Sequence, residues 1–157
     1  MHKPLQNQKV AILAASGVTE THMTEIQKNL MKTGAFARII SVDHALLNSW
    51  NGSGWGVNFA VDAALSTALG VDYDMLIIPG GTRSTEKLMR TAHTKRFLDS
   101  FMRLQKPICV VEDGAELLDS CGIDRKSENI AVIDENEMSV MVTHFIESAQ
   151  PDMAAAA

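Results

Sequence analysis

The feature that most constrains the fold is a set of short, mostly apolar runs, each closed by a turn signal. Residues 9–14 (KVAILA), 36–42 (FARIISV), 75–79 (MLIIP), 107–111 (PICVV) and 130–133 (IAVI) have this form. Runs of about four to eight apolar residues bounded by turn residues are typical of strands buried on both faces. The chain is therefore expected to build a mostly parallel sheet.

Segments with apolar residues at helical spacing separate these runs. Residues 93–105 give the clearest example, with Phe97, Phe101 and Leu104 on one face. Further helices are expected at residues 21–33, 114–120 and 138–146. Strands that alternate with helices favour parallel pairing through right-handed crossovers, because each helix covers a face of the sheet. Residues 48–56 (NSWNGSGWG) interrupt this alternation and are expected to form a loop, in which Trp50 and Trp55 anchor the loop or line a pocket or subunit contact.

Length and charge narrow the classes of function. The 157 residues predict a single domain over 1–150, followed by a disordered tail at 151–157. With no signal segment and no apolar run long enough to cross a bilayer, the cytoplasm is the expected location. A net charge of -5 without a basic stripe argues against nucleic-acid binding. The two cysteines, Cys109 and Cys121, form neither a disulfide framework nor a metal-binding pair.

Chemistry in an open parallel sheet is expected at the carboxyl ends of the strands. Three such ends carry polar or glycine residues: 16–22, 79–82 and 111–114. At the third, a strand turns directly into a helix through Glu112, Asp113 and Gly114. A turn of this kind forces the residue at the bend into a tight conformation and presents its side chain above the sheet.

Two of these segments resemble motifs of the ThiJ/PfpI family, in the class I glutamine-amidotransferase-like superfamily. Residues 72–81 (DYDMLIIPGG) match the family's D-Y-D-x-L-x-x-P-G-G segment, and residues 106–114 (KPICVVEDG) with Leu117 and Leu118 resemble its K-P-x-x-x-x-C-H-G elbow. The resemblance covers about residues 9–123. It implies a flavodoxin-like three-layer α/β sandwich, and a homodimer or higher homo-oligomer as the partner state.

The resemblance fails at the reactive positions. The family's nucleophilic cysteine falls on Glu112 and the neighbouring histidine on Asp113, while its helix-borne acid falls on or beside His22, with Glu20 two residues earlier. A carboxylate is a far weaker nucleophile than a thiolate. Peptidase, deglycase and glyoxalase activity by the family's route is therefore not expected, and Cys109, inside a strand, is expected to be buried and inert.

The replacement suggests a pair between His22 and Glu112, with Asp113 beside it as a further candidate catalytic residue. Such a carboxylate would favour the protonated imidazole and fix its tautomer, giving an acid/base couple or half of a metal site. A structural hydrogen-bonded pair is the alternative. Metal binding by His22, Glu112 and Asp113 would need a third ligand within reach, and Asp113 is expected to point elsewhere. No metal or other cofactor is therefore expected. Glu20, Gly80, Gly81 and Thr82 are the candidate ligand-binding residues, because glycine lets a small molecule approach the backbone closely.

A second resemblance is to the C-terminal domains of large-subunit catalases, which are similar to ThiJ/PfpI domains without the reactive cysteine. It implies a role in structure and assembly. The sequence thus favours a non-peptidase domain with a degenerate active site that acts in binding, assembly or stress protection. The alternative is a hydrolase, hydratase or isomerase that acts on a small molecule and uses Glu112 as general base.

Overall fold

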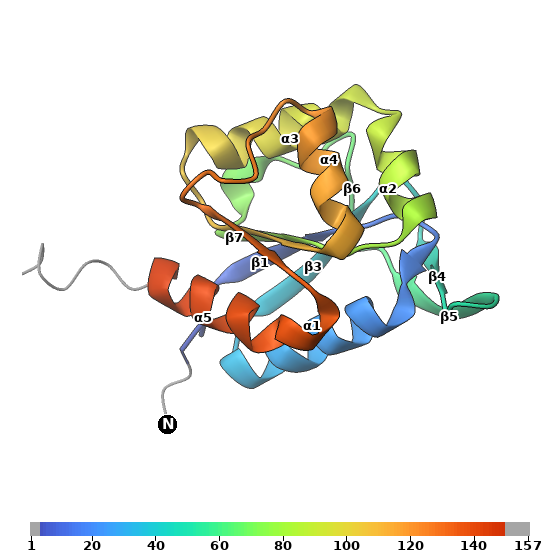
Figure 1. The fold of residues 1–157 in the computed structure, drawn as a ribbon, viewed down its shortest axis with the longest axis horizontal. Coiled ribbons are helices and arrows are strands. Elements are labelled where there is room, and N and C mark those ends of the chain that lie inside the picture. Colours follow the sequence, from blue (N-terminus) through green and yellow to red (C-terminus); the bar gives the residue numbers. More distant parts are fainter. Residues whose placement is uncertain (1–3, 150–157) are drawn as a thin grey trace, which may run out of the picture.

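The computed structural model describes residues 4–149. At its centre lies a six-stranded parallel sheet with the strand order β6-β3-β1-β7-β8-β9 (Figure 1). These strands are β1 (Lys9–Leu13), β3 (Phe36–Ser41), β6 (Ala63–Ala64), β7 (Met75–Ile78), β8 (Ile108–Val111) and β9 (Ile130–Ile133). The expected parallel α/β architecture is confirmed, and five of the strands coincide with the predicted apolar runs.

Helices cover both faces of this sheet and make a three-layer sandwich (Figure 1). One face packs against α1 (Glu20–Thr33) and α5 (Met138–Ala149). The other packs against α2 (Thr82–Met89), α3 (Ala92–Arg103) and α4 (Ala115–Ser120). Single 3₁₀ turns at Gly70–Asp72 (η1), Glu112–Gly114 (η2) and Glu135–Glu137 (η3) complete the connections.

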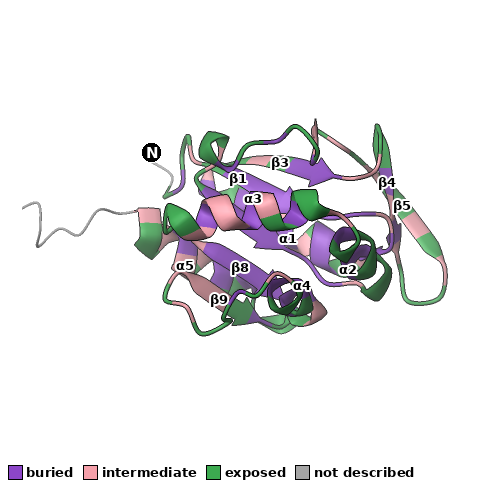
Figure 2. Ribbon diagram, turned by 90° about the horizontal axis from the view of Figure 1, so that it is seen from above, coloured by how far each residue is buried: buried purple, intermediate pink, exposed green. Residues whose placement is uncertain are grey.

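Alternate residues of each central strand enter opposite cores. In β1, Val10 and Ile12 belong to the core beneath α1 and α5, whereas Ala11 and Leu13 belong to the core beneath α2, α3 and α4. All four side chains are fully buried, as are those of β7 and β8 (Figure 2). In these three strands, polar residues are therefore confined to the ends, where they can reach solvent or one another.

Residues 48–56 differ from the expected loop. They belong to a hairpin of β4 (Leu46–Trp50) and β5 (Trp55–Ala60), which joins β2 (Val18–Thr19) in a second, three-stranded sheet. The side chain of Asn51 accepts hydrogen bonds from the backbone N–H groups of Ser53 (3.0 Å) and Gly54 (2.9 Å). The glycine-rich sequence forms the turn of a hairpin, and the two tryptophans stand on its strands.

Two other expectations concern the ends and the environment of the chain. Within residues 4–149, no helix has the length and apolar character that crossing a bilayer requires. The tail expected at 151–157 lies outside the described residues.

The aromatic core between β7 and α3 provides a test of the fold. Phe97 is fully buried and packs edge-on against Phe101 with 5.2 Å between ring centroids. Phe97→Ala is expected to lower the free energy of unfolding by about 3–5 kcal/mol, because it leaves a cavity. Phe36→Ala is the control: its ring is 49% exposed, and its loss should cost less than about 1 kcal/mol. Urea unfolding would measure both, and equal effects would contradict the assigned core.

Candidate functional site

Glu112 lies at the bend where β8 ends and the 3₁₀ turn before α4 begins. Its φ angle is 50°, in the left-handed region that a residue with a side chain rarely adopts. Holding a non-glycine residue there costs about 1–2 kcal/mol, so the surrounding structure must impose the conformation. The side chain is 44% exposed and lies at the carboxyl edge of the sheet, as the strand-to-helix turn predicts.

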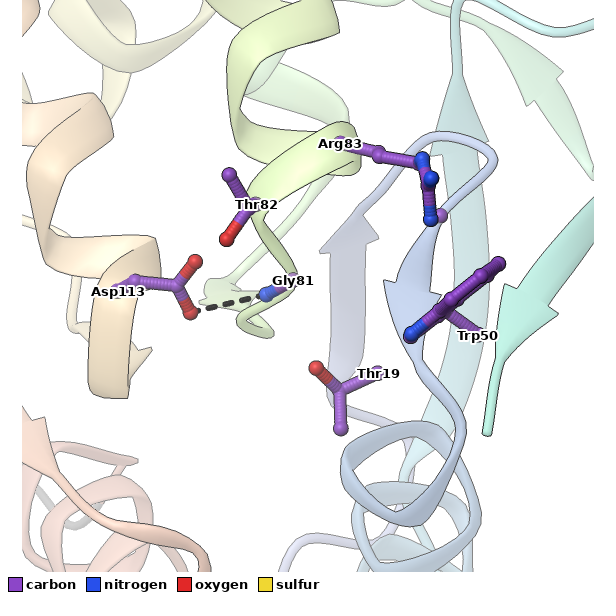
Figure 3. A pocket seen from close by; sticks show the side chains of 7 residues that line it. Thr19, Trp50, Gly81, Thr82, Arg83 and Asp113 are labelled. Carbon is purple, nitrogen blue, oxygen red and sulfur yellow. Dashed lines mark hydrogen bonds between the residues drawn. The ribbon is translucent and has the colours of Figure 1, made fainter. Parts of the chain in front are cut away.

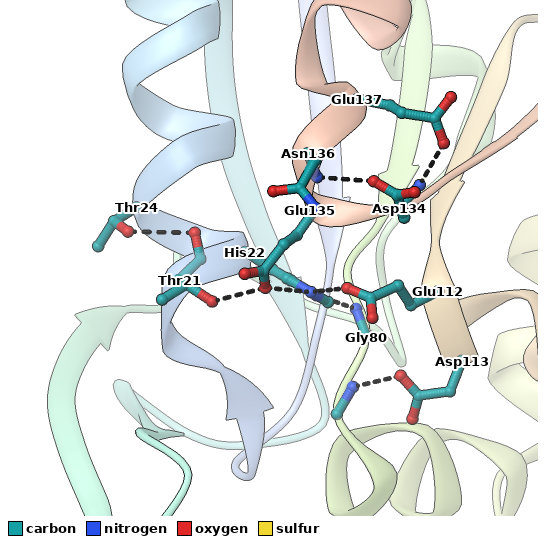
Figure 4. A network of polar contacts seen from close by, with 11 residues as sticks. Thr21, His22, Thr24, Gly80, Glu112, Asp113, Asp134, Glu135, Asn136 and Glu137 are labelled. Carbon is teal, nitrogen blue, oxygen red and sulfur yellow. Dashed lines mark hydrogen bonds and ion pairs between the residues drawn. The ribbon is translucent and has the colours of Figure 1, made fainter.

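His22 meets Glu112 from the first turn of α1 (Figure 4). Its Nε2 atom lies 2.6 Å from Oε2 of Glu112, while its Nδ1 atom accepts a hydrogen bond of 2.9 Å from the backbone N–H of Gly80. A backbone N–H can only donate, so Nδ1 carries a lone pair and the proton of the neutral ring lies on Nε2. The buried imidazole is therefore a fixed donor to the carboxylate.

Glu135 is a third member of this cluster that the sequence analysis did not identify. Its Oε2 atom lies 3.3 Å from Nε2 of His22 and accepts a 3.0 Å hydrogen bond from the hydroxyl of Thr21. It stands in η3, directly after β9 and before α5. Residues that follow a parallel strand lie at the carboxyl edge of the sheet, as Glu112 does after β8. Glu135 follows β9, and its position in the sequence could therefore have indicated that it lies at the same edge.

His22, Glu112 and Glu135 offer ligand atoms within 4.8 Å of one another. A histidine that binds a metal through Nε2 normally keeps a proton on Nδ1 and donates it to an acceptor. In this structure Nδ1 faces the Gly80 N–H, which is a donor. A metal at Nε2 would leave the ring proton on Nδ1, where it would point at the N–H of Gly80, unless the ring lost both protons and became an imidazolate. The three groups therefore fit a hydrogen-bonded cluster better than a metal site. Asp113, named in the predicted ligand set, points elsewhere.

Asp113 caps the glycine turn after β7. Its Oδ1 atom accepts a hydrogen bond of 2.9 Å from the backbone N–H of Gly81. A Cβ atom on Gly80 would run into this carboxylate and would lie 2.9 Å from Cε1 of His22. Both glycines of the turn are therefore held by polar groups of the same chain, and Gly80 has no room for a side chain.

Glu20, predicted as a ligand-binding residue, faces the hairpin instead. Its Oε1 atom accepts hydrogen bonds from the N–H of Val57 (2.8 Å) and the hydroxyl of Ser49 (3.1 Å). The carboxylate fixes the hairpin to the start of α1. The structure gives Glu20 this role in the fold, and a ligand contact by its side chain stays a prediction.

An open cleft of about 530 Å³ lies beside the cluster (Figure 3). The Cζ atom of Arg83 lies over the ring of Trp50, 4.0 Å from its centroid, and 5.6 Å from the centroid of Trp55. Trp50 and Trp55 pack edge-on, with 5.5 Å between their centroids. Trp50 thus lines a pocket, which is one of the two roles that the sequence left open. The other walls include Gly81, Thr82 and Asp113.

Comparison with known proteins places this geometry in a family. Residues 8–148 match the sequence model of the DJ-1/PfpI family. The chain belongs to this family. Among solved structures, oxidized DJ-1 of Toxoplasma gondii is 19% identical with a TM-score of 0.74, over 90% of this chain and 94% of that one. DJ-1 of Schizosaccharomyces pombe is 14% identical with a TM-score of 0.74, over 92% and 93% of the two chains.

A curated relative supports the second resemblance. Catalase HPII of Mycobacterium avium is 25% identical over 149 residues, which is 94% of this chain and 20% of that catalase. The chain therefore spans about a fifth of the length of this relative. The similarity to both the DJ-1/PfpI family and a catalase agrees with the two resemblances found in the sequence.

The tight packing of the glycine turn yields a stability prediction. Gly80→Ala should lower the free energy of unfolding by about 1–3 kcal/mol, because the new methyl group must displace the carboxylate of Asp113 or the ring of His22. Gly54→Ala is the matched control, since no atom lies within 4 Å of a Cβ there, and its effect should stay within about 0.5 kcal/mol. Thermal and urea unfolding would compare the variants. Similar stabilities for the two would show that the turn is not packed in this way.

The tautomer of His22 can be measured directly. Long-range ¹H–¹⁵N spectra at neutral pH should show a protonated Nε2 and an unprotonated Nδ1, with the signals assigned by their loss in His22→Gln. Addition of Zn²⁺ should leave these signals unchanged, because metal at Nε2 would require a proton at Nδ1. A ring protonated at Nδ1, or a shift of the His22 signals with zinc, would contradict the hydrogen-bond assignment.

Proposed function

We propose that this chain is a non-peptidase DJ-1/PfpI domain that acts through noncovalent binding and assembly, with a role in structure or stress protection. In this proposal Glu112 occupies the position of the family's nucleophilic cysteine. Its place at a strained bend after β8, with φ at 50°, supports that equivalence, because a nucleophile elbow has the same strand-turn-helix form. A carboxylate there does not reproduce thiolate chemistry.

The observation that carries the proposal is the internal pairing of the donors around the bend. The N–H of Gly80 is bound to His22, and the N–H of Gly81 is bound to Asp113. Acyl-transfer and carbonyl chemistry need donors that point at the developing oxyanion and are free to bind it. Both N–H groups of the turn already have acceptors, and one of these is a carboxylate that would repel an oxyanion.

The cysteines supply no substitute nucleophile. Cys109 is fully buried in β8, and burial raises the pKa of its thiol to about 12. At neutral pH roughly one molecule in 10⁵ would carry the thiolate. Cys121 follows α4 at its carboxyl end, and burial raises its pKa too. Neither cysteine therefore offers the thiolate that thiol-dependent turnover would need.

Assembly is supported by the similarity to part of a catalase and by the surface of the hairpin. Leu46, Trp55 and Val57 project from β4 and β5 with about half of their surface exposed. We propose a homodimer or a larger homo-oligomer. Burial of such side chains against a second chain would remove apolar surface from water.

A second candidate function is general base catalysis by Glu112 in a small-molecule hydrolase, hydratase or isomerase. The specific observation in its favour is that the carboxylate is half exposed, strained into place and bound to a histidine of fixed tautomer. Oriented carboxylates of this kind serve as bases in proton transfer. Glu112→Gln would keep the shape of the side chain and remove its basicity.

A labelling and turnover experiment distinguishes these functions. Native protein should react slowly with a thiol reagent, with Cys109 labelled upon unfolding, and should turn over neither aminopeptidase substrates nor methylglyoxal. Glu112→Cys is the positive control, since a thiol at the exposed bend should react at least about tenfold faster than Cys121.

A fast-reacting thiol in the native chain, or turnover of either substrate class, would contradict the noncovalent function. Turnover of any metabolite in a screen that disappears in Glu112→Gln, with unchanged unfolding, would favour the general base instead.

A further inference from the structure

The cleft beside Glu112 carries one cationic and one anionic side chain that face a common space. Figure 3 shows Asp113 on one side of Gly81, and Arg83 with Trp50 on the other. A volume of about 530 Å³ is in the range of small-molecule sites. Thr82 adds a hydroxyl group between the two charges.

Arg83 is held in place without losing its hydrogen-bonding capacity. Its Cζ atom lies 4.0 Å from the centroid of the Trp50 ring, and this cation–π contact uses none of the N–H groups of the guanidinium as hydrogen-bond donors. Within residues 4–149 its side chain has no carboxylate or hydrogen-bond partner. An arginine with free N–H groups can bind a carboxylate through two parallel hydrogen bonds.

Asp113 restricts what can enter. One of its oxygens binds the N–H of Gly81, and the other has no hydrogen-bond partner in the described part of the chain. A free inorganic anion would be attracted by Arg83 and repelled by Asp113, whereas a simple cation would meet the opposite pair of forces. A molecule that carries both charges can place its anionic group at Arg83 and its cationic group at Asp113.

We propose that this cleft binds a small zwitterion with a carboxylate and an ammonium group, of the size of a free amino acid or a dipeptide. Its carboxylate binds Arg83 and the hydroxyl of Thr82, its ammonium group binds the unpaired oxygen of Asp113, and its side chain lies against Trp50. This inference rests on the proposed noncovalent function, and it names the class of ligand for that site.

The two tryptophans of the chain provide a direct readout, because both stand on the hairpin beside the cleft. Tryptophan fluorescence and calorimetry would follow titrations with leucine and with the dipeptide Gly-Leu, which distinguish an amino acid from a peptide source. N-acetyl-leucine lacks the ammonium group, leucinamide lacks the carboxylate, and inorganic phosphate tests for a simple anion site. We expect saturable binding of at least one free zwitterion, weakened at least about tenfold when its amine or its carboxylate is blocked.

Two variants and a control locate the site. Arg83→Gln removes the cation, and Asp113→Asn removes the charge while keeping an oxygen that can accept from Gly81. Each should weaken binding at least about tenfold, as followed by calorimetry. Arg90→Gln, at the far end of α2, should leave it unchanged.

The inference is overturned if neither zwitterion binds below about 10 mM, if the blocked forms or phosphate bind as tightly, or if Arg90→Gln weakens binding equally. Such a result would leave the proposed noncovalent function standing. That function fails instead through a fast-reacting thiol or through turnover, which are separate measurements.

Discussion

The hydrogen bond from the backbone of Gly80 to Nδ1 of His22 determines the chemistry of the carboxyl edge. It ties the turn after β7 to the first turn of α1. Because the backbone can only donate, it also fixes the proton of the ring on Nε2, where Glu112 and Glu135 converge. This one hydrogen bond orients His22 toward Glu112, disfavours metal binding at Nε2, and leaves the N–H of Gly80 unavailable to a ligand. A side chain at Gly80 would disturb all three at once, because its Cβ atom would meet both Asp113 and His22.

The sequence predicted the sheet and most helices from its apolar runs and helical spacing, whereas the pair of His22 with Glu112 was suggested by the resemblance to the ThiJ/PfpI family. Strands buried on both faces leave no place for polar side chains except the strand ends, and parallel strands bring those ends to one edge. Glu112 follows one strand, and His22 starts the helix after another, so their approach follows from the topology.

Other parts of the site could not be predicted, because they depend on contacts between distant segments. The hairpin was expected to be a loop, since its composition indicates a turn while its strands are held by cross-strand bonds and by Glu20. Glu20 was named as a candidate ligand-binding residue because the helix-borne acid of the family falls on or beside His22, two residues later. On a helix, neighbours two positions apart do not face each other, and its carboxylate turns to the hairpin. Glu135 follows the last strand and so could be expected at the same edge, but the sequence does not show how close the turn between β9 and α5 comes to α1.

The placement of Glu20 connects the cluster to the cleft. Its carboxylate holds β4 and β5, and these strands carry Trp50 and Trp55 to the guanidinium of Arg83. The acid two residues before His22 therefore supports the wall of the cleft through the hairpin. The carboxylate of Asp113 also has two roles: it accepts a hydrogen bond from the N–H of Gly81, and it forms a wall of the cleft. The two acidic residues support a site in which charges are held apart by the fold, and that arrangement suits recognition of a bipolar molecule more than attack on a neutral carbonyl.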